Sequence, residues 1–237
     1  MNHPRRRATL TCLAAGLLTA ALPAVSAAAY PDKPIRLVVP FPPGQGADIL
    51  ARLIGQHLAA ALGQPIVVEN KVGAGGIIGT AFAAKAAPDG YTLYMGSSGP
   101  LAIGPHVYKA VGFDTLKDFA PISNIASVTQ VLVTAPASQL ASAKDVVERA
   151  RAQPGMVPFG SAGSGTTSHL TMELFTQMSG ISLSHVPYKG SSTSMIDVMA
   201  GRVPLMFDSL PGVLTNVKSG SLRAIAVASA QRDPLLP

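Results

Sequence analysis

Hydrophobic and polar positions recur along this chain with two different periods, which predict alternating strands and helices. Ile35 to Val39 is a short apolar run that stops at Pro40. After a loop rich in proline and glycine, Asp48 begins a segment whose apolar residues recur at steps of three and four, namely Ile49, Leu50, Leu53, Ile54, Leu58 and Leu62. The pattern therefore predicts a strand, a tight loop and a helix.

Strand-like and helix-like segments continue to alternate to the end of the chain, which is typical of an α/β fold with largely parallel sheets. Further strands are predicted at residues 66–69, 91–95, 128–134, 157–159, 184–186, 203–207 and 222–228. Further helices are predicted at residues 77–85, 142–153, 167–178, 192–200 and 211–218, with short irregular helices between residues 100 and 125. Ser142 and Asp145 have the spacing of a capping box.

We expect these elements to form two lobes. The first lobe runs from residue 30 to residue 125, and the second from residue 126 to residue 228. Three predicted strands leave the first lobe incomplete, so residues 229–237 are expected to begin a segment that returns to it. The fold class predicted is a two-lobed α/β fold that is truncated at its C-terminus.

Residues 1–29 have the pattern of a secretory signal peptide. Three arginines at positions 5–7 precede a short apolar core at residues 13–22, and small residues at 27–29 offer a cleavage site. The core is too short for a membrane span, and the mature chain has no longer apolar run. A periplasmic protein without direct membrane insertion is expected, exported by either the general or the twin-arginine route.

Charge and cysteine content bear on which partners the protein can bind and on how its fold is stabilised. Removing the three leader arginines from 18 basic residues leaves 15 against 12 acidic residues, so the net charge falls from +6 to +3. Because no basic cluster with interleaved aromatic residues is present, nucleic acid is not an expected partner. Cys12 is the only cysteine and lies in the leader, so the mature chain depends on its hydrophobic core instead of disulfides.

The loop between the first strand and its helix offers backbone N–H groups to an anion. The first turn of a helix leaves N–H groups unpaired, and small loop residues keep them accessible, so we expect a carboxylate to bind there. The candidate residues are Phe41, Gly44, Gln45, Gly46, Ala47 and Asp48. An ordinary strand–helix turn with Asp48 as its cap is the alternative.

A similar junction follows the strand predicted at residues 157–159, and it adds hydroxyl groups. Its candidate residues are Ser161, Ala162, Gly163, Gly165, Thr166 and Thr167. His169 either helps to complete the helix start or lines the cleft. Because neither loop contains Lys or Arg, a dianionic ligand held between the two helix starts is expected to meet N–H groups, hydroxyls and water instead of ion pairs.

Three more candidates stand at the ends of predicted strands, where α/β proteins commonly place ligands. Ser97 and Ser98 follow the third strand. Asp208 closes the strand at residues 203–207 and either receives an ammonium group or a water in the cleft, or caps the helix after Pro211. Both roles of Asp208 remain open at this point.

Motifs for catalysis, metals and cofactors fail on spacing. No stretch matches the G-x-S-x-G pattern of serine hydrolases, and Gly79 comes one position late for a dinucleotide-binding turn. His169 and Glu173 lie four residues apart on one helix without an evident third metal ligand. We therefore expect a binding protein with no catalytic residue, metal or cofactor, and a secreted carboxylate-processing hydrolase is the alternative.

Five segments in order resemble one protein family. They are residues 30–44, 68–76, 88–93, 160–170 and 185–190, which contain PDKPIR, VENKVGAGG, PDGYTL, GSAGSGTTSHL and HVPYKG. The mature chain is similar, nearly end to end, to the substrate-binding proteins of tripartite tricarboxylate transporters, the Bug-type receptors.

The resemblance implies a periplasmic binding protein of type II fold that closes over a small carboxylate and delivers it to the permease subunits of the transporter. It places the carboxylate at residues 41–48 and 160–169, with water as go-between. Gln45 departs from the family, which often has a glycine there. A monomer is expected, and a ligand-sensing accessory of a two-component system is the alternative to transport.

Overall fold

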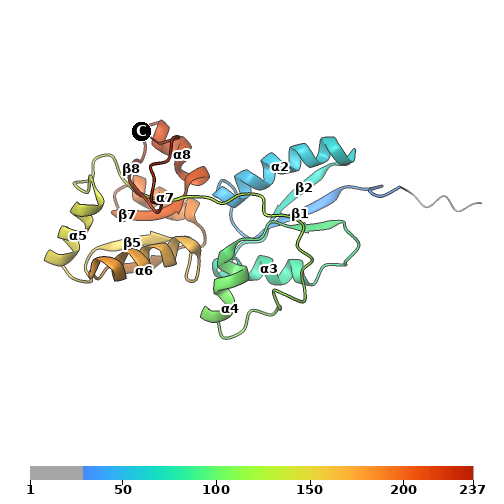
Figure 1. Ribbon diagram of the computed structural model, residues 1–237, viewed down its shortest axis with the longest axis horizontal. Coiled ribbons are helices and arrows are strands. Elements are labelled where there is room, and N and C mark those ends of the chain that lie inside the picture. Colours follow the sequence, from blue (N-terminus) through green and yellow to red (C-terminus); the bar gives the residue numbers. More distant parts are fainter. Residues whose placement is uncertain (1–28, 237) are drawn as a thin grey trace, which may run out of the picture. The chain divides into compact units, whose positions relative to one another are not determined.

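The computed structural model describes residues 29–236, whose strands form two separate sheets (Figure 1). The predicted signal peptide, residues 1–29, lies outside the described residues except for its last position. Within residues 29–236, no helix is both long and apolar enough to cross a membrane.

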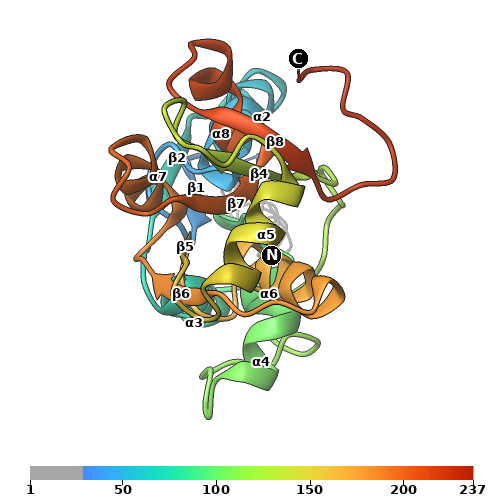
Figure 2. The same ribbon diagram turned by 90° about the vertical axis from the view of Figure 1, so that its left-hand side faces the viewer.

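The first sheet contains three parallel strands in the order β2-β1-β3. These are β1 (Ile35–Val39), β2 (Ile66–Asn70) and β3 (Thr92–Tyr94). Helix α2 (Gly46–Leu62) and helix α3 (Ile77–Ala84) cover opposite faces of this sheet, as Figures 1 and 2 show. Leu37 and Val39 pack against Ala51 of α2, so the apolar stripe of that helix faces the core.

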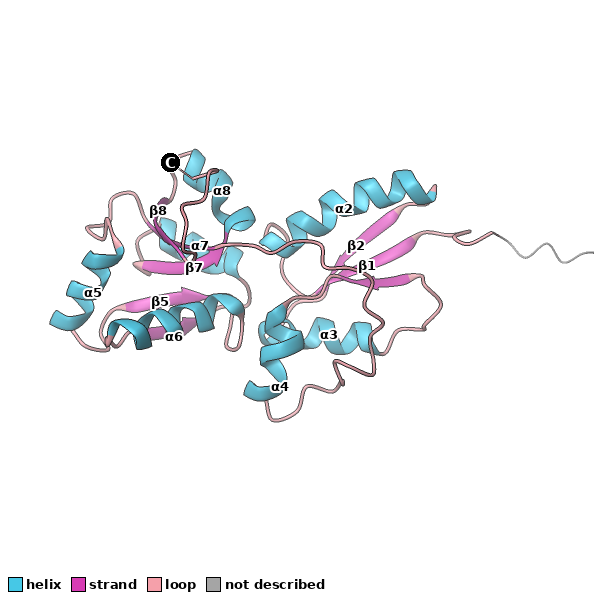
Figure 3. Ribbon diagram, in the orientation of Figure 1, coloured by secondary structure: helices cyan, strands magenta, loops and turns pink. Residues whose placement is uncertain are grey.

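The second sheet contains five strands in the order β6-β5-β7-β4-β8, drawn in magenta in Figure 3. The strands are β4 (Gln130–Thr134), β5 (Pro158–Ser161), β6 (Ser184–Pro187), β7 (Leu205–Ser209) and β8 (Arg223–Val227). Strand β5 is parallel to β6 and β7, but β4 is antiparallel to both β7 and β8. The prediction of largely parallel sheets is therefore wrong for β4, because an apolar run indicates burial on both faces but not strand direction.

Helices cover both faces of the second sheet. Val131 and Val133 of β4 pack with α7 (Ser191–Met199) and α8 (Leu210–Lys218). Leu132, whose side chain points to the other face, packs with α5 (Ala143–Ala152) and α6 (Thr167–Ser179). The alternation of side chains along one strand thus builds two hydrophobic cores.

The structure differs from the predicted elements at the start of α2 and between residues 100 and 125. Helix α2 begins at Gly46, two residues before Asp48, because Gln45 adopts the extended conformation of an N-cap. Between residues 100 and 125, the structure has only the π-helical turn η2 (Gly99–Ile103) and the short helix α4 (Gly104–Val107). A short 3₁₀ turn, η1 (Ala74–Gly76), precedes α3.

The predicted capping box at the start of α5 is confirmed. The Asp145 N–H donates to the Ser142 hydroxyl over 3.2 Å, and the Ser142 N–H donates to the Asp145 carboxylate over 2.8 Å. Ser142→Ala is therefore expected to lower the free energy of unfolding by about 1 kcal/mol, measured by urea denaturation. Ser182→Ala, at an exposed serine outside the helices, is the control, and equal losses in both variants would contradict the role of the cap.

Candidate functional site

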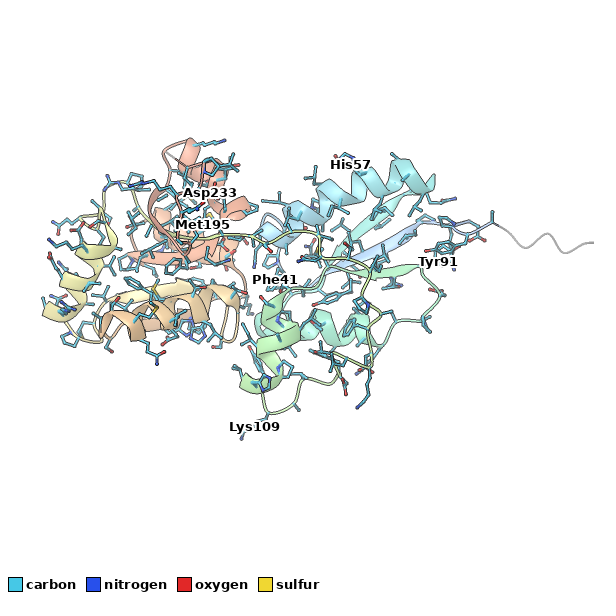
Figure 4. All side chains as sticks on the ribbon, viewed as in Figure 1. Phe41, His57, Tyr91, Lys109, Met195 and Asp233 are labelled. Atoms are coloured by element: carbon cyan, nitrogen blue, oxygen red, sulfur yellow. The ribbon has the colours of Figure 1, made fainter. Side chains whose placement is uncertain are left out.

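The candidate residues lie where strands of each sheet end. Because β1 and β3 are parallel, Phe41 after β1 and Tyr91 before β3 lie at opposite ends of the first sheet (Figure 4). The loops that follow β1, β5 and β7 lead into α2, α6 and α8. Ligands of α/β proteins are commonly bound at such carboxyl ends.

Asp48 organises the loop before α2. The residue is 2% exposed, and its carboxylate accepts hydrogen bonds from the Gly44 N–H (2.9 Å), the Arg52 Nε–H (2.9 Å) and the Asn70 side-chain amide (2.8 Å). Burial raises the pKa of Asp48, but these bonds outweigh it and hold the pKa below its usual value. Asp48 therefore stabilises the loop from inside, and its contact with a ligand stays a prediction.

Only part of this loop has N–H groups left for a ligand. The Gly44 N–H donates to Asp48, and the Gln45 N–H donates to the Pro42 carbonyl over 3.3 Å. Among the residues that the structure describes, the N–H groups of Gly46 and Ala47 have no acceptor. The anion-binding capacity of the first loop is thus concentrated in the first turn of α2.

Gln45 contacts the segment that begins α7. The residue is 8% exposed, and its Oε1 accepts a hydrogen bond from the Ser191 N–H over 3.1 Å. Gly190, which precedes Ser191, lies against Pro42 of the loop, since a Cβ atom added to this glycine would lie 2.2 Å from Cγ of Pro42. The glutamine that departs from the family pattern therefore joins the 41–48 loop to α7.

The second loop is also held largely by its own side chains. The Ala162 N–H donates to the Ser168 hydroxyl, and the Thr166 hydroxyl donates to the Gly163 carbonyl over 2.6 Å. Thr166 is the N-cap residue of α6. Within residues 29–236, the N–H groups of Ser164 and Thr167 have no acceptor, so they are available to donate to an anion.

The turn at residues 73–76 lies between the two loops. A Cβ atom on Gly76 would lie 3.3 Å from the Phe41 ring, and one on Gly75 would lie 2.7 Å from the Ser164 carbonyl oxygen. This confirms the interpretation of the glycine-rich run as a turn that permits close packing. The first and second candidate loops therefore lie on either side of one glycine-rich turn.

Three further hydrogen bonds involve residues around the start of α6 and the segment that begins η2. The Ser98 hydroxyl lies 3.1 Å from the Thr167 hydroxyl. The Tyr108 hydroxyl donates to the Ser164 carbonyl over 2.8 Å. Ser97, one residue earlier, accepts the Leu101 N–H through its carbonyl at the start of η2. Ser97 and Ser98 thus border the start of α6, and their contact with a ligand stays a prediction.

Sequence reasoning missed a histidine pair behind the second loop. His185 of β6 lies beside Phe159 in the strand register, and its ring stacks on His169 with 3.9 Å between centroids. Ser161 Oγ lies 2.6 Å from His185 Nε2, and His169 Nδ1 accepts the Gly165 N–H over 3.3 Å. The sequence indicated only that His185 lies in a predicted strand, and the pairing of that strand with β5 comes from the assembled sheet.

The Ser161–His185 pair bears on the hydrolase alternative. A serine nucleophile needs a base in reach and a route to its substrate. Ser161 is fully buried, and no carboxylate among the described residues bonds to His185. Within residues 29–236 there is also no group of three His, Cys, Asp or Glu side chains that would hold a metal. The geometry supports a structural role for this pair.

Asp208 lies under the start of α8. Its Oδ1 accepts the Ser209 N–H over 2.8 Å, and its Oδ2 is buried without a hydrogen-bond partner among the described residues. Burial raises the pKa of Asp208 to about 6, although the neighbouring Ser191 and Ser209 lower it in part. Ser209 itself is the N-cap of α8, so Asp208 does not cap that helix. Its contact with a ligand remains a prediction.

Comparisons with known proteins agree on one family. The family model described as a tripartite tricarboxylate transporter family receptor matches residues 50–237. The protein BugT of Bordetella pertussis is 42% identical over 214 residues, which cover 90% of this chain and 66% of BugT. The chain thus spans about two thirds of the length of that relative.

Solved structures give the same fold. Rpa4515 of R. palustris, solved with adipate, is 37% identical with a TM-score of 0.83 over 86% of this chain and 68% of that chain. MatC of Rhodopseudomonas palustris, solved with malate, is 27% identical with a TM-score of 0.81 over 86% of this chain and 70% of that chain. These similarities confirm the predicted two-lobed α/β fold class of the periplasmic binding proteins.

Proposed function

Because this chain belongs to the family of tripartite tricarboxylate transporter receptors, we propose that it is a receptor that captures a small carboxylate and delivers it to a membrane permease. The family resemblance predicted from five motifs is thereby confirmed. The observation that carries the proposal is the pair of helix starts, α2 and α6. The N–H groups of Gly46, Ala47 and Thr167 in these helix starts, and of Ser164 in the loop before α6, have no acceptor among the described residues.

The chemistry of these two helix starts favours an anion. Each helix start carries a partial positive charge from its aligned peptide dipoles, and its unpaired N–H groups donate hydrogen bonds. Neither loop contains a lysine or arginine, and Arg52, four residues into α2, is bound to Asp48. A carboxylate is therefore recognised by N–H groups and by hydroxyls such as those of Ser98 and Thr167.

The ligands of relatives support the class of ligand. Adipate and malate, named for Rpa4515 and MatC, are both dicarboxylates. Two helix starts on either side of the 73–76 turn offer one set of N–H donors for each carboxylate. The ligand is then held in a cleft between the lobes. We propose that the protein acts in the periplasm as a monomer, and that the lobes close over the ligand.

A thermal-shift screen of the protein against mono-, di- and tricarboxylates and amino acids tests the proposal. A ligand that binds only the native state at about 100 times its Kd adds about 2.7 kcal/mol of stability, so the Tm is expected to rise by roughly 5 °C or more. Diamides of the same acids are the controls, because they keep the shape and lose the charge. An equal shift with acid and diamide would contradict recognition of a carboxylate.

A further inference from the structure

The turn at residues 163–165 is held from both ends by histidine rings on different elements. On one side, the Gly163 N–H donates to Ser161 Oγ over 3.1 Å, and Ser161 Oγ lies 2.6 Å from His185 Nε2. On the other side, the Gly165 N–H donates to His169 Nδ1 over 3.3 Å. The two rings stack at 22°, so they hold the turn as one unit.

The hydrogen bonds of this turn are all paired when both rings are neutral. Ser161 Oγ accepts the Gly163 N–H, and among the described residues His185 Nε2 is the one acceptor bonded to its own hydrogen, so an unprotonated Nε2 completes the pairing of this buried hydroxyl. His169 Nδ1 accepts the Gly165 N–H, so it carries no hydrogen either. Protonation of His169 Nδ1 puts a donor opposite the Gly165 N–H, and protonation of His185 Nε2 removes the acceptor of the Ser161 hydrogen. Two cationic rings in one stack also repel each other.

We propose that His169 and His185 are positioning residues that hold the turn at residues 163–165 only while both rings are neutral, so that acid weakens ligand binding. This inference rests on the proposed carboxylate site. The turn leads directly to the N–H groups of Ser164 and Thr167, and Gly163 and Gly165 have φ values of 122° and 74° that other residues rarely adopt. Losing the Gly165 hydrogen bond, together with the acceptor of the buried Ser161 hydrogen, therefore displaces the N–H groups offered to the ligand.

The surroundings of the pair favour the neutral rings. Burial lowers the pKa of both histidines, and burial together with the smaller effect of repulsion from His169 lowers that of His185 to about 4. Glu173, 49% exposed and 3.5 Å from His169 Nε2, raises the pKa of His169 only in part.

Other titratable groups on or next to the neighbouring elements are Tyr188 and Lys189 after β6, Asp208 of β7 and Tyr108 after α4. None of them contributes to the pKa of either ring.

The pH dependence follows from these directions. The pKa of His185 is lowered in the ordered turn and returns toward 6.5 when the turn opens, so the open turn binds the proton more tightly than the ordered turn does. The ordered turn is therefore favoured above about pH 6.5 and loses stability progressively as the pH falls toward about 4. Ligand binding is expected to weaken over the same range.

The test uses NMR first, without any ligand. Ring ¹⁵N shifts of His169 and His185 and amide shifts of Gly163 and Gly165 are followed from about pH 7.5 to about pH 4. We expect the two amide resonances to move with the same midpoints as the rings. Rings that titrate while both amides stay unchanged would overturn the inference, whether or not a ligand has been found.

The second measurement compares adipate affinity at about pH 7 and about pH 4.5. The double variant His169→Asn, His185→Gln keeps acceptor oxygens in place and cannot titrate, and His57→Gln, at an exposed histidine of α2, is the control (Figure 4). Wild type and His57→Gln are expected to lose at least about tenfold more affinity than the double variant. The single variants serve if the double variant does not fold, as judged by circular dichroism.

The outcomes separate the inference from the proposed function. Equal losses in wild type and the variants would overturn the inference, because the titration of adipate itself is common to all of them. Failure of wild type to bind any carboxylate at about pH 7 would overturn the proposed function. The NMR titration would then still decide whether the histidine pair controls the turn.

Discussion

Gly190→Ala is expected to weaken carboxylate binding at least roughly tenfold, about 1.4 kcal/mol. The added Cβ would lie 2.2 Å from Cγ and 2.5 Å from Cδ of Pro42, whose ring has no rotamer that moves it aside. The backbone of Gly190 has a φ of 147°, so alanine also adds strain of about 1–3 kcal/mol. The 41–48 loop must therefore move away from α7, and the first turn of α2 moves with it. Isothermal titration calorimetry measures the loss.

Gly201→Ala is the control for Gly190→Ala. Gly201 also has a positive φ, 72°, but nothing lies within 4 Å of its added Cβ. We expect this variant to lose stability without losing affinity. The double variant Gly190→Ala, Pro42→Ala removes the ring that causes the clash, and it should recover part of the affinity. Wild-type affinity in Gly190→Ala would show that the 41–48 loop and α7 need not approach for binding.

Asp48→Ala is expected to lower the free energy of unfolding by about 2–4 kcal/mol, measured by urea denaturation. The substitution removes the acceptor of three donors. They are the Gly44 N–H in the loop before α2, the Asn70 amide at the end of β2 and the Arg52 Nε–H. Arg52→Ala is the control, because the Arg52 side chain is 51% exposed and its pairing is expected to contribute less than about 1 kcal/mol. Equal losses in both variants would show that the ion pair, not the buried carboxylate, stabilises the loop.

The loss caused by Asp48→Ala also depends on pH. Hydrogen bonds hold the pKa of Asp48 below its ordinary value of 3.8 despite the opposing effect of burial. The native carboxylate therefore contributes stability above about pH 4, and this contribution is lost as the pH falls through the lowered pKa. The stability difference between wild type and Asp48→Ala should shrink in acid. A difference that stays constant down to about pH 2.5 would contradict the assignment of these bonds to the charged form.

Much of the site was accessible from local sequence. The apolar period placed the first helix after a proline and glycine-rich loop, and the family motifs included the loop that precedes α6. Helix starts are local features, because unpaired N–H groups follow from the hydrogen-bond geometry of any helix. What local sequence did not reveal is which N–H groups are already used, such as that of Gly44, whose acceptor is the side chain of Asp48.

The remaining features depend on contacts between distant segments. Gln45 and Ser191 are 146 positions apart, and Ser161 and His185 are 24 apart on different strands. Strand β4 has the composition of a buried parallel strand, yet it pairs in the antiparallel sense with β7 and β8. No periodic pattern reports strand direction or the partner of a side chain, so these features appear only once the sheets are assembled.

The sequence by itself determined the family, the α/β order of elements and the two loops at strand ends, because burial periodicity, turn chemistry and helix starts are local properties. The tertiary structure alone decided the direction of β4, the buried role of Asp48 and the stacking of His169 on His185. These depend on which strands lie side by side, and packing distant segments together is what brings an aspartate to its donors and one imidazole ring onto another.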